Sequence, residues 1–109
     1  MLTKLEEQIL MTVWEFEGEG YGVNVFQHLE KINDKKIALG VVYDVMERLR
    51  KKDLLEARMG TPTPVRGGMR KKYYSITKAG IEALAESKET YDRVMSGFDR
   101  LFAQYKELP

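Results

Sequence analysis

The sequence predicts a mostly α-helical protein with one small β-hairpin, and three observations support this fold class. Apolar residues recur at helical spacing along most of the 109 residues. Two short segments with strand character, residues 54–59 and 69–76, flank a loop rich in Pro and Gly. Residues 48–72 hold nine Lys and Arg and only two acids, although the whole chain has a net charge of +1. This uneven charge indicates a polyanion-binding surface, with a solvated charged face as the alternative.

The first helix is expected from about Lys4 to Glu17. Thr3 and Glu6 have the spacing of a capping box, in which each side chain accepts a hydrogen bond from the other residue's backbone. The apolar face of this helix comprises Leu5, Ile9, Leu10, Val13 and Trp14. We expect Trp14 to lie in the core or against a second subunit, with stacking on a ligand as the alternative.

A second helix is expected from about Tyr21 to Ile32. His28 in this helix is the only histidine, and the chain has no Cys. Because no second imidazole or thiolate is present to share a metal, we expect a partly exposed helical histidine and no metal site. The buried stripe of this helix is expected at Val25, Phe26, Leu29 and Ile32.

A third helix is expected from Gly40 to about Asp53, after a polar turn over residues 33–38. Its apolar residues stand at positions i, i+3, i+4 and i+7, so they form one inward stripe. The members of this stripe are Val42, Val45, Met46 and Leu49. The opposite side then carries polar and aromatic residues, among them Tyr43, Glu47, Arg50 and Lys51.

Two helices joined by a short turn are typical of a helix-turn-helix. In that motif the early residues of the second helix face base edges, and nearby cations bind phosphates. We therefore predict DNA-facing positions at Val41, Tyr43 and Asp44 and phosphate contacts at Arg48 and Lys51. The alternative role for the cations of the last turns is interaction with the helix dipole, which requires no DNA.

The two strand segments predict a hairpin directly after the third helix, which is the layout of a winged helix-turn-helix. The connecting loop, residues 60–68, is too long for a tight turn. Arg66 in this loop, and Arg70 and Lys72 on the return strand, are predicted to bind phosphates. A surface loop with no role in binding is the alternative for residues 60–68.

Thr77 is expected to cap a last helix from Lys78 to about Lys106. At 1.5 Å per residue this helix is about 43 Å long, too long for a small core to cover. One face repeats on average every 3.5 residues, which is the coiled-coil period, at Leu84, Lys88, Tyr91, Met95, Phe98, Phe102 and Tyr105. We expect a second copy of the chain to cover this face, with packing on the first helix as the alternative for its first half. Gly97 interrupts the helical pattern and allows a bend.

These elements predict a winged helix-turn-helix domain at residues 1–77 and a dimerisation helix at residues 78–109. The dimer seam is predicted to include Trp14, Tyr91, Met95, Phe98 and Phe102. The same apolar seam could admit a small apolar effector.

Composition argues against several other classes of protein. The chain has no Cys, a single His, and no Gly-rich loop between a strand and a helix, so neither an enzyme nor a bound cofactor is predicted. No apolar run approaches the roughly 20 residues that span a bilayer. The N-terminus also lacks the pattern of a signal peptide. We therefore expect a cytoplasmic protein without membrane contact.

The segment GVVYDVMERLRKKDLL resembles the recognition helix of the PadR-like transcriptional regulators, which typically reads G-T-L-Y-P and continues to R-L, a basic tail and G-L-I. The shared residues are Gly40, Tyr43, Arg48, Leu49, Leu54 and Leu55. Tyr21 and Gly22 resemble the family's aromatic-Gly entry to the second helix. Residues 70–80, RKKYYSITKAG, resemble its wing strand and the start of its next helix. The chain departs from this pattern at Val41 for Thr, Asp44 for Pro and Asp53 for Gly.

The resemblance implies a winged helix-turn-helix domain, a C-terminal dimerisation helix and repression of a gene, often relieved by a small effector. We therefore predict a homodimeric, sequence-specific regulator that binds double-stranded DNA, acts as a repressor and responds to a small apolar or aromatic effector. A winged helix that binds an acidic protein is the alternative. The acids Asp44 and Glu47, expected on the reading face, favour that alternative.

Overall fold

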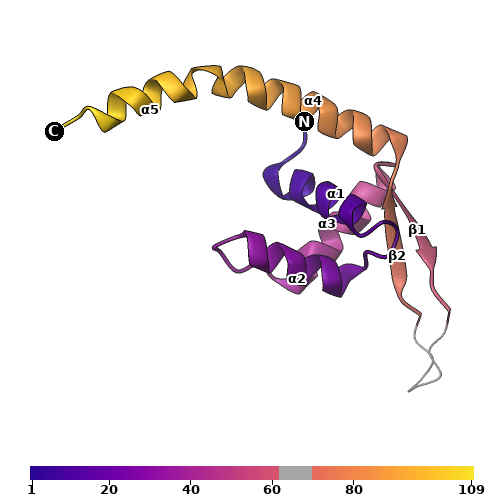
Figure 1. The fold of residues 1–109 in the computed structure, drawn as a ribbon. Helices are drawn as coiled ribbons and strands as arrows, with labels where there is room; N and C mark the ends of the chain where they lie inside the picture. Colours follow the sequence, from indigo (N-terminus) through magenta and orange to yellow (C-terminus); the bar gives the residue numbers. More distant parts are fainter. Residues whose placement is uncertain (62–69) are drawn as a thin grey trace.

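Three helices, a hairpin and a C-terminal helical rod follow one another along the chain in the computed structural model (Figure 1). The structure describes residues 1–61 and 70–109. The order confirms the predicted fold class, a mostly helical chain with one β-hairpin. The elements are α1 (Lys4–Glu15), α2 (Gly22–Ile32), α3 (Leu39–Lys51), β1 (Leu55–Met59), β2 (Lys72–Ile76), α4 (Lys78–Val94), a 3₁₀ turn η1 (Met95–Gly97) and α5 (Phe98–Lys106).

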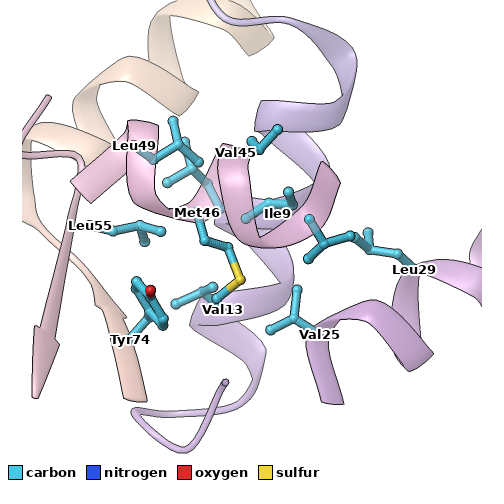
Figure 2. Close-up of a cluster of buried hydrophobic side chains, with 11 residues drawn as sticks. Ile9, Val13, Val25, Leu29, Val45, Met46, Leu49, Leu55 and Tyr74 are labelled. Atoms are coloured by element: carbon cyan, nitrogen blue, oxygen red, sulfur yellow. The ribbon is translucent and has the colours of Figure 1, made fainter. Parts of the chain in front are cut away.

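We call α1, α2, α3 and the hairpin the body, and α4, η1 and α5 the arm. The core lies in the body, where one apolar stripe from each of the three helices meets two residues of the strands (Figure 2). Its buried members are Ile9, Leu10, Val13, Val25, Leu29, Val42, Val45, Met46, Leu49, Leu55 and Tyr74. The helical spacing of the sequence predicted most of these stripes, because a residue three or four positions along a helix returns to the same face. The exceptions are Trp14 of α1 and Ile32 at the end of α2, which are 58% and 54% exposed.

The N-terminal capping box is present as predicted. The backbone N–H of Thr3 donates to Glu6 Oε1 at 2.8 Å, and the backbone N–H of Glu6 donates to Thr3 Oγ1 at 3.1 Å. At the other end, α1 stops at Glu15, two residues before the expected end. Glu17 and Gly18 both have positive φ, 51° and 85°, and this left-handed backbone cannot continue a right-handed helix.

The hairpin is antiparallel, with Leu55 opposite Ile76 and Met59 opposite Lys72. The sequence predicted a strand from Met69, which itself lies outside the described residues. Among the described residues β2 begins at Lys72, opposite the last residue of β1, Met59, so Arg70 and Lys71 are not part of the strand. The backbone N–H of Tyr74 also donates to the Gly20 carbonyl at 2.8 Å, so the link between α1 and α2 adds a bridge to the edge of β2. The hairpin is thereby fixed to the helices at its base.

The hydroxyl of Thr77 fixes the start of α4 to the end of α3. Thr77 Oγ1 accepts from the Gly80 N–H at 3.0 Å, as its predicted capping role requires, and donates to the Asp53 carbonyl at 2.6 Å. Gly80 is needed here, since a Cβ would lie 2.3 Å from the Leu54 carbonyl oxygen. Asp53 has φ of 60°, a left-handed conformation that explains why the resembled pattern has Gly at this position.

The prediction of one unbroken helix from Lys78 to Lys106 was wrong. The 3₁₀ turn η1 separates α4 from α5, and Gly97 within it is the residue whose low helix propensity the sequence had indicated. The arm runs along α1 and then extends beyond the body, so the molecule is 63 Å in its longest dimension (Figure 1). Among the described residues, no helix is both long and apolar enough to cross a membrane.

Candidate nucleic-acid interface

The first turns of α3 present the side chains that the sequence predicted to face DNA. Val41 and Tyr43 are 44% and 42% exposed, and Asp44 is exposed beside them. The buried stripe of the same helix faces the core, so these three residues point away from it. Tyr43 lies against Gly22 at the start of α2: a Cβ on Gly22 would be 2.1 Å from Tyr43 Cε1. Gly22 therefore makes room for the tyrosine ring and limits its movement.

A cluster around Glu47 joins α3 to the hairpin. Tyr74 Oη donates to Glu47 Oε2 at 2.5 Å, and Lys72 Nζ lies 2.9 Å from the same oxygen. Arg50 Nε and Nη2 both lie 3.1 Å from Glu47 Oε1. Burial raises the pKa of Glu47, but the hydrogen bonds from Tyr74, Lys72 and Arg50 outweigh it and lower the pKa to about 2. Burial, together with the bond to Glu47, raises the pKa of Tyr74.

The placement of Glu47 corrects the sequence analysis, which put this carboxylate on the open reading face. The side chain instead points toward β2, one-third exposed, and is saturated by three donors. Tyr74 and Lys72 are 27 and 25 residues away along the chain, so no local pattern could indicate the contact. The one available signal was the spacing of Glu47 and Arg50, since residues three apart on a helix are neighbours.

A second carboxylate, Glu6, holds the cations at the end of α3. Its side chain is only 3% exposed, and Oε2 lies 3.7 Å from Arg48 Nε and 3.6 Å from Lys52 Nζ. Burial raises the pKa of Glu6, but hydrogen bonds from Thr3 and the charges of Lys52 and Arg48 lower it overall. Arg48, predicted as a phosphate ligand, is thus half-exposed and shared with a buried carboxylate. The sequence indicated the capping role of Glu6 but not its contacts with Arg48 and Lys52.

The other predicted phosphate ligands differ in their surroundings. Lys51 and Arg70 are exposed, and within residues 1–61 and 70–109 no carboxylate lies within 4 Å of either. Lys72 is paired with Glu47. Arg66 lies outside the described residues. The described cations of α3 and the hairpin are therefore of two kinds, those held by a carboxylate and those open to solvent.

The predicted seam is divided between two parts of the arm. Trp14 and Tyr91, both 58% exposed, line one apolar groove of about 550 Å³ between α1 and α4, together with Met11, Ile81 and Leu84. Phe98 and Phe102 lie on α5, which leads away from α1 (Figure 1). Their rings stack with centroids 5.6 Å apart. Met95 lies between the two groups, in η1. Within one chain the groove and the stacked rings are therefore separate, and Trp14 is not a core residue.

A three-helix body with a two-stranded hairpin after the third helix, followed by a long C-terminal helix, defines a winged helix-turn-helix protein. The family model "Transcriptional regulator PadR-like family" matches residues 9–86. The chain therefore belongs to the PadR-like family of transcriptional regulators. This membership confirms the resemblance found in the sequence and the prediction that the protein is a regulator rather than an enzyme.

The chain is also similar to individual proteins and solved structures. The chain is 31% identical over 102 residues to a Lysinibacillus sphaericus protein described only as uncharacterized, covering 87% of this chain and 91% of that one. The crystal structure of a PadR-like transcriptional regulator from Bacillus cereus is 28% identical, with a TM-score of 0.70 and coverage of 90% of each chain. Bacillus subtilis PadR in complex with operator DNA is similar in fold, with a TM-score of 0.63, 18% identity and coverage of 79% of this chain and 47% of that one.

Proposed function

We propose that this PadR-like regulator is a cytoplasmic homodimer that binds double-stranded DNA sequence-specifically and represses transcription. The observation that carries the proposal is the juxtaposition of an open α3 surface, with Val41, Tyr43 and Asp44, and the cations of the hairpin. A helix that presents side chains to base edges beside a basic wing is the arrangement that reads a major groove. The fold shared with a protein solved on operator DNA supports the same use of this surface.

The cations of this surface would contribute unequally. Lys51 and Arg70 are open to phosphates, whereas Arg48 and Lys72 are shared with Glu6 and Glu47. Arg66 stays a predicted contact from the loop. Val41 offers only a methyl contact, for example to thymine, and Tyr43 offers a hydroxyl.

The arm supports the homodimer. Its α5 has no buried residue, yet it presents Phe98, Phe102 and Tyr105 as one stacked row with ring centroids 5.6 Å apart. An exposed apolar row of this kind indicates an interface. A second copy would cover it, and two bodies could then reach successive major grooves about 34 Å apart.

We also propose that a small apolar effector binds in the groove between α1 and α4. The groove is lined by Trp14, Met11 and Tyr91, and its volume of about 550 Å³ is within the range of small-molecule sites. A ligand bound there would contact both α1 and α4 and could change the relative position of body and arm. A screen of apolar and aromatic compounds for a shift of the unfolding temperature tests this part.

DNA binding is tested by selecting duplexes from a random pool and measuring the affinity of a selected duplex between about 50 and 200 mM salt. We expect a strong salt dependence, with a slope of about −0.9 per phosphate contact. Lys51→Gln should make the slope shallower by about 0.9 per subunit, whereas Lys4→Gln, the same charge change at the start of α1, should not. Failure to select any duplex, with binding of an acidic protein instead, would favour the interaction-module alternative.

The dimer is tested separately by light scattering. We expect twice the chain mass of 12.6 kDa. The double substitution Phe98→Ser and Phe102→Ser should give the single-chain mass. The control Leu108→Ser, at an even more exposed apolar residue just past α5, should not. Repression is tested with a reporter that has the selected duplex at its promoter. Increased expression on adding the protein would identify an activator.

A further inference from the structure

We propose that Glu47 is a positioning residue that holds Lys72 of the wing and Arg50 of α3 away from the DNA backbone and so limits binding to non-cognate duplexes. The inference rests on the proposed DNA-binding function and assigns a role to the carboxylate beneath that surface. It rests on the geometry of four side chains contributed by two elements, α3 and β2.

The contacts around Glu47 use both carboxylate oxygens. Oε2 accepts from the Tyr74 hydroxyl at 2.5 Å and lies 2.9 Å from Lys72 Nζ, while Oε1 lies 3.1 Å from Arg50 Nη2. Tyr74 is 2% exposed and belongs to the core, so it fixes the position of the carboxylate from below. The two cations are thus attached to a group that cannot follow them toward a phosphate.

Because both cations are partly exposed, a DNA phosphate can compete with Glu47 for them. Lys72 and Arg50 side chains are 38% and 37% exposed, so each can reach solvent if it leaves the carboxylate. A DNA phosphate must therefore replace an existing hydrogen-bonded ion pair, and the gain from each contact is reduced. Lys51 has no carboxylate partner among the described residues, so it can bind a phosphate without first breaking an ion pair.

Non-specific binding depends almost entirely on phosphate contacts, whereas specific binding also uses base contacts. A carboxylate that withholds two cations should therefore weaken non-specific binding more than cognate binding. Glu47 also joins α3 to β2, so it sets where the wing lies relative to the reading helix. Both effects favour discrimination between sequences.

Glu47→Gln tests the inference because an amide oxygen can still accept from Tyr74 but has no charge to hold the cations. We expect a tighter complex with random-sequence duplex and a salt slope steeper by about 0.9 per subunit for each cation released. The ratio of cognate to random affinity should fall. Glu82→Gln, the same charge change on an exposed turn of α4, is the matched control and should leave both quantities unchanged.

Lys72→Gln is a second test that does not alter Glu47 or the core. In the wild-type background it should change the salt slope less than Lys51→Gln does, because Glu47 already restrains Lys72. In the Glu47→Gln background, Lys72→Gln should remove most of the increase in salt slope that Glu47→Gln causes. Tyr74→Phe removes the hydroxyl but leaves both ion pairs, so it reports any effect of the hydrogen bond alone.

Three results would overturn the inference. They are equal effects of Glu47→Gln and Glu82→Gln, an unchanged salt slope in a folded Glu47→Gln protein, and an effect of Lys72→Gln as large as that of Lys51→Gln. In each case the wild type would still bind the selected duplex, so the proposed function would stand. If the wild type bound no duplex at all, the proposed function and this inference would fall together.

Discussion

The body and the arm both contain many large apolar residues, but they bury them very differently. Among its described residues the body buries eleven hydrophobic side chains almost completely, with Ile9, Leu29 and Met46 at 0% exposure. In the arm only Gly80 is buried, and Phe98, Leu101 and Tyr105 remain 44%, 61% and 63% exposed. The body therefore forms its core within one chain, whereas the apolar surface of the arm stays open to solvent in the single chain, which supports the proposed dimer.

The polar contacts of the two regions differ in the same way. Two carboxylates of the body, Glu6 and Glu47, are fully or partly buried and contact residues distant in sequence. Ion pairs in the arm join Lys88 to Asp92 and Arg93 to Glu89, all exposed and four residues apart. Exposed pairs of this kind are screened by water and contribute little to stability. The body is therefore held by tertiary contacts and the arm by its own helical hydrogen bonds.

The largest effect is expected for a core truncation in the body. Leu29→Ala removes a side chain at 0% exposure and leaves a cavity, which should lower the free energy of unfolding by about 2–5 kcal/mol. Urea unfolding followed by circular dichroism measures the change, which should be the same at every protein concentration. A loss under about 1 kcal/mol would mean that the body repacks around α2.

Phe102→Ala in the arm should act through association instead. The urea midpoint of the wild type is expected to rise with protein concentration, because a partner that binds only the folded state adds about 2.7 kcal/mol at 100 times the dissociation constant. In Phe102→Ala this rise should disappear, while the value at high dilution stays that of the wild type. A wild-type midpoint independent of concentration would contradict the contrast between body and arm.

Gly80→Ala tests the junction between the two regions. The new Cβ would lie 2.3 Å from the Leu54 carbonyl oxygen, a backbone atom that cannot turn away, so we expect a loss of about 1–3 kcal/mol. Gly40→Ala is the control in α3, where a Cβ meets nothing within 4 Å. It should be neutral or stabilise the protein by up to about 1 kcal/mol. The shift of the unfolding temperature measures both effects. Equal shifts for Gly80→Ala and Gly40→Ala would show that the backbone at Leu54 moves to accommodate the new Cβ at little cost.

Acid should weaken the body more than the arm. The pKa of Glu47 is about 2 in the folded state, compared with 4.5 for an unperturbed glutamate. Its contribution is therefore fully present above pH 4.5 and is lost as the pH falls toward 2. At 1.36 kcal/mol per pKa unit, reduced because the side chain is one-third exposed, the loss is about 2 kcal/mol. The difference in unfolding free energy between wild type and Glu47→Gln should narrow from pH 6 to pH 3, and a constant difference would contradict this.

Whether a contact could be predicted from the sequence depends on how far apart its residues lie along the chain. The caps at Thr3 and Thr77, the apolar stripes of α1 and α3 and the interruption at Gly97 depend on residues within four positions of each other. Such contacts repeat with the period of the helix, so they can be read along the chain. The same holds for the basic segment and for the regularity of the apolar face in the arm.

The sequence by itself therefore determined the order of the elements, the family pattern and the basic character of the hairpin and of α3. Only the tertiary structure decided that Gly22 accommodates Tyr43, that Glu6 holds Arg48, and that Glu47 faces the wing. These contacts join residues about 20 to 40 positions apart, and no periodicity links such positions. They form only when three helices and a hairpin enclose one core, which brings the side chains together.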